Sequence, residues 1–322
     1  MRRVLGYLLG ATALSGAGLV GFAWWTTRQI EAAVPPTGRF IDIAGQSIHY
    51  TDQGSGPAIL FIHGLGGQTR NFPPAVIEPL ARSHRVVVFD RPGSGFSTRP
   101  YNAAANLRAQ AATVAALIER LGLHRPVLVG HSLGGALALT LALEHPDCVG
   151  ALALIAPLTQ SVDASPEPFR GLVVQSPLKR LLIAWTLAVP AAMARGAETL
   201  KEVFAPDTIP ADYGTTYGGL LGLRPKAFYS ASTDLVAAPA DLVGLVPRYP
   251  TIAVPVGILY GSGDHILDPA LHGRRLADAI PGAELELVDG GGHMTPIAQP
   301  ARTVAFIERV AAKLAPLQRL SA

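Results

Sequence analysis

Short, predominantly apolar runs alternate with amphipathic segments along most of the chain. Runs of this kind, bounded by Gly, Pro and charged residues, predict buried parallel strands. The predicted strands are Ala58–Ile62, Arg85–Phe89, a run ending at Val129, Val149–Ile155, Val254–Tyr260 and Glu284–Val288. Helices are predicted over Pro74–Ser83, Asn106–Leu121, the segment from Leu133 to Glu144, Pro269–Ile280 and Pro296–Leu314. The alternation predicts an α/β fold with a mostly parallel, doubly wound sheet and helices on both faces.

The alternation begins after a predicted hairpin, Arg39–Ala44 and Ser47–Thr51, and it stops between residues 158 and 249. Helical pieces occupy that interval: Leu172–Val174, Leu178–Val189 and Ala191–Phe204. A stretch of about ninety residues is too long for an ordinary loop. We expect a helical lid over the carboxyl ends of the strands, where open α/β sheets bind ligands. The expected core therefore comprises residues 35–157 and 250–322, and the cap or lid comprises residues 158–249.

A long uncharged segment precedes the core. Residues 4–27 contain no charge, Arg2 and Arg3 come before them, and Trp24 and Trp25 close the segment as interfacial aromatics do. The length matches the roughly 20 residues that cross a bilayer, and it exceeds the about 7–15 apolar residues of a cleaved signal peptide. The sequence predicts a transmembrane anchor within residues 1–34, with the main domain on the non-cytoplasmic (periplasmic or extracellular) side. The alternative is secretion after cleavage.

Composition narrows the classes of function. The chain has 322 residues, of which 49% are hydrophobic and 15% charged, and its net charge is +3. This content supports a large core, and no basic patch with interleaved aromatics indicates nucleic-acid binding. The single cysteine, Cys148, excludes an intramolecular disulfide framework and a cysteine-based zinc site. We expect no metal and no organic cofactor.

A Gly-rich corner carries the candidate nucleophile. The sequence Gly130-His131-Ser132-Leu133-Gly134 matches G-x-S-x-G and joins an apolar run to an Ala/Leu-rich helix. In a nucleophile elbow the serine sits at the tip of a strained turn, and glycines on both sides avoid a collision of Cβ atoms. The N–H of Leu133 is then positioned to stabilise an oxyanion. A Gly/Ser loop with no catalytic role has the same local pattern, so the partners of Ser132 must decide between the two readings.

The partners are expected at the ends of later strands, in the order serine, acid, histidine. His293 lies in a Gly-rich loop after Glu284–Val288, and we interpret it as the general base. Asp264 directly follows Val254–Tyr260 and is the expected acid. Three neighbours are interpreted differently: Asp289 is a weaker rival acid, Asp268 a helix cap and His265 a loop residue.

The second oxyanion donor is expected after Ala58–Ile62, in His63-Gly64-Leu65-Gly66-Gly67. The glycines allow the backbone to turn its N–H groups inward, and we assign the N–H of Leu65 as the partner of that of Leu133. Their side chains are expected to line the substrate pocket. His63 is expected to brace the loop by hydrogen bonds rather than to act chemically.

Jointly these motifs resemble the α/β-hydrolase superfamily over about residues 39–315. The motifs that carry the resemblance are His63-Gly64, Asp90-Arg91-Pro92-Gly93-Ser94-Gly95-Phe96-Ser97, Gly130 to Gly135, Gly261-Ser262-Gly263-Asp264 and Gly292-His293. The resemblance implies a triad of Ser132, Asp264 and His293, with Asp90 in a structural role. Epoxide hydrolases and haloalkane dehalogenases of this fold carry aspartate at the elbow, so the serine disfavours those activities.

The anchor, core and lid together look like membrane-bound esterases and monoacylglycerol-type lipases. We therefore expect a serine hydrolase that cleaves carboxylic esters, with a small-molecule, lipid-like substrate because the lid is rich in Leu, Val and Ala. The same apolar residues would also serve simply to pack the lid on the core. C–C bond hydrolases, perhydrolases, peptidases and acyltransferases share the triad, and a non-catalytic ligand-binding receptor is the alternative outside the enzymes.

Overall fold

The computed structural model describes the backbone of residues 2–162 and 165–320 and the side chains of residues 16–162 and 165–314. Its centre is an eight-stranded sheet, counted over these residues, with the order β1-β2-β4-β3-β5-β6-β7-β8. The strands are β1 (Arg39–Ile43), β2 (Gln46–Gln53), β3 (Ala58–Ile62), β4 (Arg85–Phe89), β5 (Val127–His131), β6 (Ala151–Ile155), β7 (Val256–Gly261) and β8 (Glu284–Val288). The hairpin β1–β2 pairs antiparallel, and every pair from β4 to β8 is parallel. The predicted mostly parallel sheet is confirmed.

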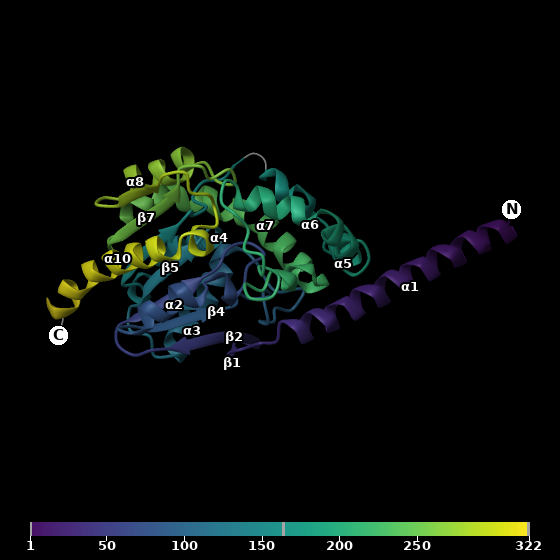
Figure 1. Cartoon of the computed structure of the whole chain (residues 1–322), viewed down its shortest axis with the longest axis horizontal. Coiled ribbons are helices and arrows are strands. Elements are labelled where there is room, and N and C mark those ends of the chain that lie inside the picture. Colours follow the sequence, from purple (N-terminus) through teal and green to yellow (C-terminus); the bar gives the residue numbers. More distant parts are fainter. Residues whose placement is uncertain (1, 163–164, 321–322) are drawn as a thin grey trace.

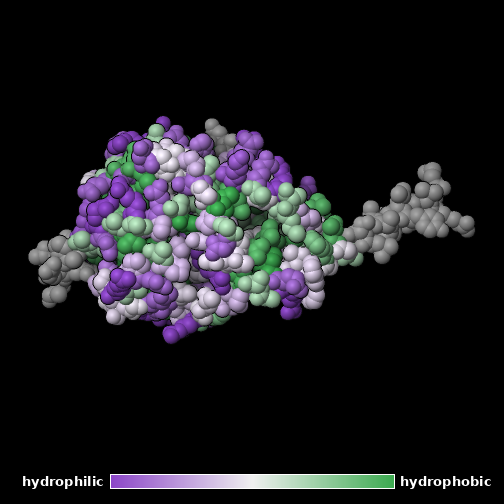
Figure 2. All heavy atoms as spheres, viewed as in Figure 1, coloured by the Kyte–Doolittle hydropathy of each residue, from purple (hydrophilic) through white to green (hydrophobic). Residues whose placement is uncertain are grey.

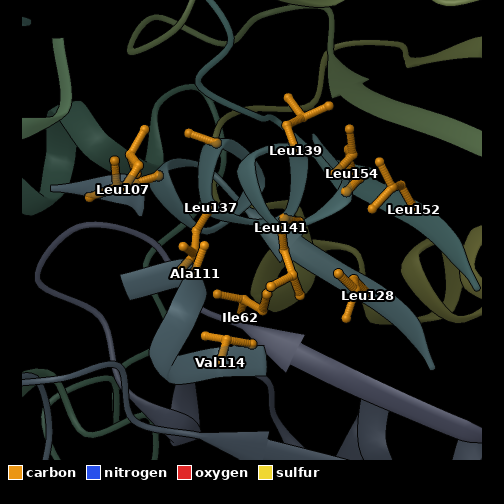
Figure 3. Close-up of a cluster of buried hydrophobic side chains, with 14 of the residues drawn as sticks. Ile62, Leu107, Ala111, Val114, Leu128, Leu137, Leu139, Leu141, Leu152 and Leu154 are labelled. Carbon is orange, nitrogen blue, oxygen red and sulfur yellow. The ribbon is translucent and has the colours of Figure 1, made fainter. Parts of the chain in front are cut away.

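Helices cover both faces of this sheet (Figure 1). The helices α3 (Leu107–Arg120), α4 (Leu133–Glu144) and α8 (Arg275–Ala279) pack on one face, and α2 (Pro74–Ala81) and α10 (Pro300–Leu320) pack on the other. Alternate residues of β3 supply the two cores: Leu60 and Ile62 face α3 and α4, whereas Ile59 and Phe61 face α2 and α10. Figure 3 shows the first of these cores, where side chains of α3 and α4 meet those of the central strands. A strand apolar on both faces is the pattern of a parallel strand covered by two helical layers.

Several element boundaries differ from the sequence prediction. β5 continues past Val129 to His131, because His131 pairs with Ile155 in the sheet although its side chain is polar. β6 begins at Ala151 rather than Val149. The predicted closing helix is two helices, α9 (Thr295–Ala298) and α10, since Gln299 precedes a proline and takes a non-helical conformation.

A helical insertion of residues 158–255 lies between β6 and β7. It contains η3 (Glu167–Leu172), α5 (Pro177–Trp185), α6 (Ala188–Phe204), η4 (Gly219–Leu223), α7 (Pro225–Leu245) and η5 (Val246–Thr251). The sequence prediction missed α7, which carries Pro239 in its interior. It also placed Leu172–Val174 in a helix, whereas η3 ends at Leu172.

The N-terminal helix α1 (Arg2–Ala33) extends away from the rest of the molecule (Figure 1). Near its C-terminal end a stripe of Ala23, Thr26 and Ile30, continued by Val34, is buried. Among the described residues no single helix has the length and hydropathy of a membrane span, although α5 and α6 pass together as a pair bent by 77°. The side chains of residues 1–15 lie outside the described residues, so the predicted anchor stays a prediction.

Candidate active site

Ser132 occupies the corner between β5 and α4. Its backbone has φ 54° and ψ −120°, a left-handed conformation that is strained for a residue with a side chain. A Cβ added to Gly134 would lie 2.1 Å from the carbonyl oxygen of Ile62, and one added to Gly130 would lie 2.6 Å from the carbonyl oxygen of Gly134. Only glycine fits at these two positions, so the sharp corner and its close approach to β3 depend on them.

Asp264 and His293 form a hydrogen-bonded pair beyond the ends of β7 and β8. The Nδ1–H of His293 donates to Oδ2 of Asp264 over 2.8 Å, and both side chains are buried. The second carboxylate oxygen accepts the N–H groups of Ile266 and Leu267 at 2.8 and 3.0 Å. Burial alone would raise the pKa of the Asp264 carboxyl, but the imidazole and these N–H groups outweigh it and hold the pKa below its ordinary 3.8. The ionised carboxylate keeps the proton of the ring on Nδ1 and leaves Nε2 as the basic nitrogen.

The rival residues from the sequence take no part in this hydrogen-bonded pair. Asp289 and His265 are exposed. The side chain of Asp268 accepts the N–H of Ala270 at 2.8 Å, so it caps the helical segment that starts at Pro269. Asp264 is therefore the carboxylate that the fold places against His293.

His131 connects the elbow to the loop that carries His293. Its Nε2–H donates to the carbonyl oxygen of His293 over 3.0 Å, and the two rings lie 4.9 Å apart between centroids. Burial and the neighbouring His293 lower the pKa of His131 to about 3, so it remains neutral. Within the described side chains no hydrogen bond joins Ser132 Oγ to His293, and nucleophile–base contacts of this kind often tighten only with substrate bound.

The two expected oxyanion donors lie at one site. Leu65 and Leu133 line the same cavity as Ser132, and a Cβ on Gly64 would lie 2.9 Å from Cβ of Ser132. Among the described residues, neither the Leu65 N–H nor the Leu133 N–H donates to another protein group. Two unpaired N–H groups beside a serine can stabilise a negatively charged oxygen.

His63 braces the loop before Leu65. Its Nε2 accepts the N–H of Arg91 at 2.9 Å, which places the ring proton on Nδ1, and Nδ1–H donates to the carbonyl oxygen of Gly64 at 2.9 Å. Burial, followed by the charge of Arg91, lowers the pKa of His63 to about 4. The ring is neutral and both of its nitrogens form hydrogen bonds, so it holds the loop in position.

Arg91 was not assigned a role from the sequence, although it directly follows Asp90. Its side chain is fully buried, and its Nε–H and Nη2–H donate to the carbonyl oxygens of His63 and Gly64, each at 3.1 Å. Its Nη1 donates to Asp234 of α7 at 2.8 Å. The guanidinium therefore joins the helical insertion to the loop that presents the Leu65 N–H.

Asp234 was also missed, because it lies 143 residues from Arg91 and no local pattern distinguishes it. Its second oxygen accepts from Arg99 at 2.6 Å, so one buried carboxylate pairs with two buried guanidinium groups. Asp207 of the insertion makes a similar link by accepting the N–H of Gly292 at 2.7 Å, next to His293. The insertion thus contacts both functional loops.

Asp90 has the structural role that the resemblance implies. One carboxylate oxygen accepts the N–H of Thr69 at 2.7 Å, and the other accepts from Phe96 N–H at 2.7 Å and from His49 at 2.8 Å. Burial alone would raise the pKa of Asp90, but its hydrogen bonds, that of His49 first, hold the pKa below 3.8.

The cavity at Ser132 is narrow and apolar, with a volume of about 70 Å³. Its further lining residues include Leu158, Phe169, Leu235, Ala238, Leu242, Ile266 and Leu267. A larger cavity of about 510 Å³ adjoins it across Ile266 and Leu267, and Glu167 and Glu202 lie in its wall. In the described part of the chain, no group of three His, Cys, Asp or Glu residues could hold a metal ion.

The profile of the alpha/beta hydrolase fold family matches residues 57–300, and the chain belongs to this family. An uncharacterised protein of Mycobacterium tuberculosis strain H37Rv is 29% identical over 287 residues, which cover 88% of this chain and 83% of the relative. The 2-hydroxymuconate semialdehyde hydrolase of Pseudomonas sp. strain CF600 is also 29% identical and covers 85% of this chain and 93% of the enzyme. A solved structure described as a membrane phospholipase A superposes with a TM-score of 0.69 at 24% identity, covering 98% of this chain and 99% of the other. Hydrolase activity is the functional class that the family and the Pseudomonas enzyme support.

Proposed function

We propose that the protein is a serine hydrolase that cleaves carboxylic esters. The observation that carries this proposal is the buried Asp264–His293 hydrogen bond of 2.8 Å, which the hydrogen bond from His131 to the carbonyl oxygen of His293 links to the strained corner at Ser132. A serine hydroxyl becomes an effective nucleophile only when a base removes its proton, and an oriented imidazole is suited to that step. The unpaired N–H groups of Leu65 and Leu133 complete the set.

The mechanism follows from this arrangement. Nε2 of His293 takes the proton of Ser132 while Oγ attacks the ester carbonyl carbon, and the two N–H groups bind the oxyanion. The imidazolium, stabilised by Asp264, gives its proton to the departing alcohol and leaves an acyl-enzyme. Water then attacks the acyl carbon with His293 as base, and the acid leaves as Ser132 regains its proton.

We propose lipid-like substrates. Most residues in the wall of the cavity at Ser132 are apolar, and none is charged, which suits an apolar chain rather than a charged one. The helical insertion covers this cavity in the position of a lid.

We further propose that α1 anchors the protein in a membrane. Residues 4–27 are uncharged, and the basic pair before them favours a catalytic domain on the periplasmic or extracellular side. The described membrane phospholipase A, similar over nearly the whole chain, supports the same view. Comparing membrane and soluble fractions of the full chain and of a chain starting at Pro35 tests this, and a soluble, unprocessed full chain would contradict it.

A C–C bond hydrolase is the second candidate. The same fold supports both reactions, and the Pseudomonas relative is named a 2-hydroxymuconate semialdehyde hydrolase. The deciding experiment measures hydrolysis of p-nitrophenyl esters with acyl chains of two to twelve carbons, alongside turnover of a 2-hydroxymuconate semialdehyde. Ser132→Ala is the control and is expected to be inactive and unlabelled by a fluorophosphonate. Inactive wild-type protein that a fluorophosphonate does not label would exclude the serine hydrolase, and preference for the shortest esters would exclude only the lipid-like substrate.

A further inference from the structure

Most of the large exposed hydrophobic side chains lie in two neighbouring parts of the molecule. Within the described residues thirteen are exposed, and nine of these belong to α1 or to residues 173–193. These nine, which we call the apolar face, are Val20, Phe22, Trp24, Trp25, Val173, Leu178, Leu182, Leu187 and Met193. Figure 2 shows hydrophobic side chains gathered on the body at the end from which α1 leaves. Large apolar patches on a protein surface mark interaction sites.

The packing of α1 determines where this face lies relative to the anchor. Ala23, Thr26 and Ile30 are buried at helical spacing, and Ile30 packs against Leu221 of the insertion. Glu31 forms an ion pair with Arg224 at 2.9 Å, and α1 also contacts α5. The last turns of α1 are thus bound to the insertion, and α5 lies beside them.

The same packing locates the membrane boundary. In the proposed anchor, the uncharged part of the helix from Val4 to Val20, before the buried stripe, extends about 26 Å at 1.5 Å per residue, close to the roughly 30 Å of a bilayer's hydrocarbon core. Trp24 and Trp25, both more than half exposed, then lie at the depth where tryptophans are enriched. Because α5 contacts α1, its exposed leucines lie next to this boundary.

The segment of the insertion that carries Leu178, Leu182 and Leu187 also has a charge that suits a membrane surface. From Pro168 to Ala197 the chain contains no carboxylate, whereas Lys179 and Arg195 are exposed. Basic side chains beside apolar ones favour the surface of a bilayer that contains anionic lipids.

We propose that the part of the apolar face on residues 173–193 docks on the surface of the same leaflet from which α1 emerges, in a bilayer with anionic phospholipids. The proposal rests on the proposed anchor and deepens the proposed ester hydrolysis. It identifies the substrate class as ester lipids that reside in that leaflet, because docking holds the insertion that covers Ser132 against the lipid.

A depth measurement tests the docking without using activity. In the full chain with Cys148→Ser, Leu182→Cys carries an environment-sensitive fluorophore, and the protein is reconstituted in phosphatidylcholine–phosphatidylglycerol bilayers. The matched control is Val243→Cys on α7, since Val243 is 68% exposed and Leu182 is 63% exposed. We expect lipids with a shallow nitroxide to quench the fluorophore at 182 and not at 243. Absence of quenching at both positions would overturn the proposal. It would also be overturned if the fluorophore at 182 became shielded from water with rising protein concentration but not with lipid, because that would indicate contact with a second copy of the chain.

A kinetic measurement tests the substrate class. The double variant Leu178→Asp, Leu182→Asp changes two exposed side chains, and Val243→Asp is its control. We expect the double variant to lose about tenfold in rate on a monoacylglycerol held in vesicles and to keep its rate on soluble p-nitrophenyl butyrate within about twofold. Equal rates of double variant and wild type on vesicles would refute the leaflet substrate. Wild-type protein inactive on both esters would refute ester hydrolysis, while the quenching result would still decide the docking.

Discussion

Replacing Asp234 with Asn tests whether a buried ion network supports the candidate site from a distance. Asp234 is 1% exposed and accepts from Arg91 at 2.8 Å and from Arg99 at 2.6 Å, and both guanidinium groups are buried. Asn keeps the shape of the side chain but removes its charge, so two buried cations lose the carboxylate that they share. Removing one partner of a buried pair costs about 3–5 kcal/mol, because the remaining charge is left uncompensated.

The free energy of unfolding is measured by denaturant titration of the full chain in detergent, with thermal unfolding alongside. For a chain of 322 residues a loss of 1 kcal/mol lowers the unfolding temperature by about 1.5 °C, so the variant is expected to unfold roughly 5–8 °C below the wild type. Asp241→Asn is the matched control on the same helix, because its ion pair with Arg108 is long, at 3.5 Å, and the Arg108 side chain is 46% exposed. We expect this control to cost less than about 1 kcal/mol.

Activity gives the second measurement. Arg91 also holds the carbonyl oxygens of His63 and Gly64, so loss of Asp234 is expected to lower kcat on a soluble ester more than it raises KM. A variant within about 1 kcal/mol of wild type in stability, or one that is destabilised by the expected amount but has unchanged kcat, would refute the coupling between the insertion and the oxyanion loop.

Three further predictions concern the site itself. Gly134→Ala places a Cβ 2.1 Å from a carbonyl oxygen and is expected to abolish esterase activity and fluorophosphonate labelling, whereas Gly196→Ala, on open helix surface, is expected to leave both intact. Burial gives His63 and His131 pKa values of about 4 and about 3, so only the unfolded chain binds these protons near pH 5. Stability should therefore fall by up to about 2 kcal/mol per histidine from pH 6.5 to 5, and denaturation of His63→Gln should show a shallower fall. Asp264→Asn should lower kcat about 10⁴-fold. Since the pKa of Asp264 is depressed, its carboxylate stabilises the fold above about pH 4, and this stabilisation is lost at lower pH. The stability of the variant should therefore fall less steeply below about pH 4, and a fall as steep as that of the wild type would contradict the prediction.

The order of strands and helices could be predicted from sequence because the information is local. A strand such as Ala58–Ile62 is apolar at every position, and only a sheet covered on both faces buries such a run. The elbow was also recognisable, since glycines two residues before and two residues after Ser132 indicate a sharp turn that leaves no room for a Cβ atom. Chain order then indicated Asp264 and His293, and the structure brings their side chains to 2.8 Å.

Features that depend on distant partners could not be predicted in this way. β5 extends to His131 because it pairs with Ile155, and α7 forms despite Pro239 because its inner face packs on the core. The hydrogen bond from His131 to the His293 carbonyl spans 162 residues. A polar residue in a sequence shows that it needs partners, but not which ones.

The chain's own pattern therefore determines the layered α/β architecture, the strained serine corner and the candidate acid and base, since each follows from periodicity, from glycine at a fixed spacing or from the order of residues along the chain. Tertiary structure decides how the insertion is tied to the site through Arg91 and Asp234, and which side of α1 is buried against the insertion. The physical reason is that burial and pairing of charges arise only when segments far apart in sequence meet. The local sequence around a charged residue does not indicate which distant residue it pairs with.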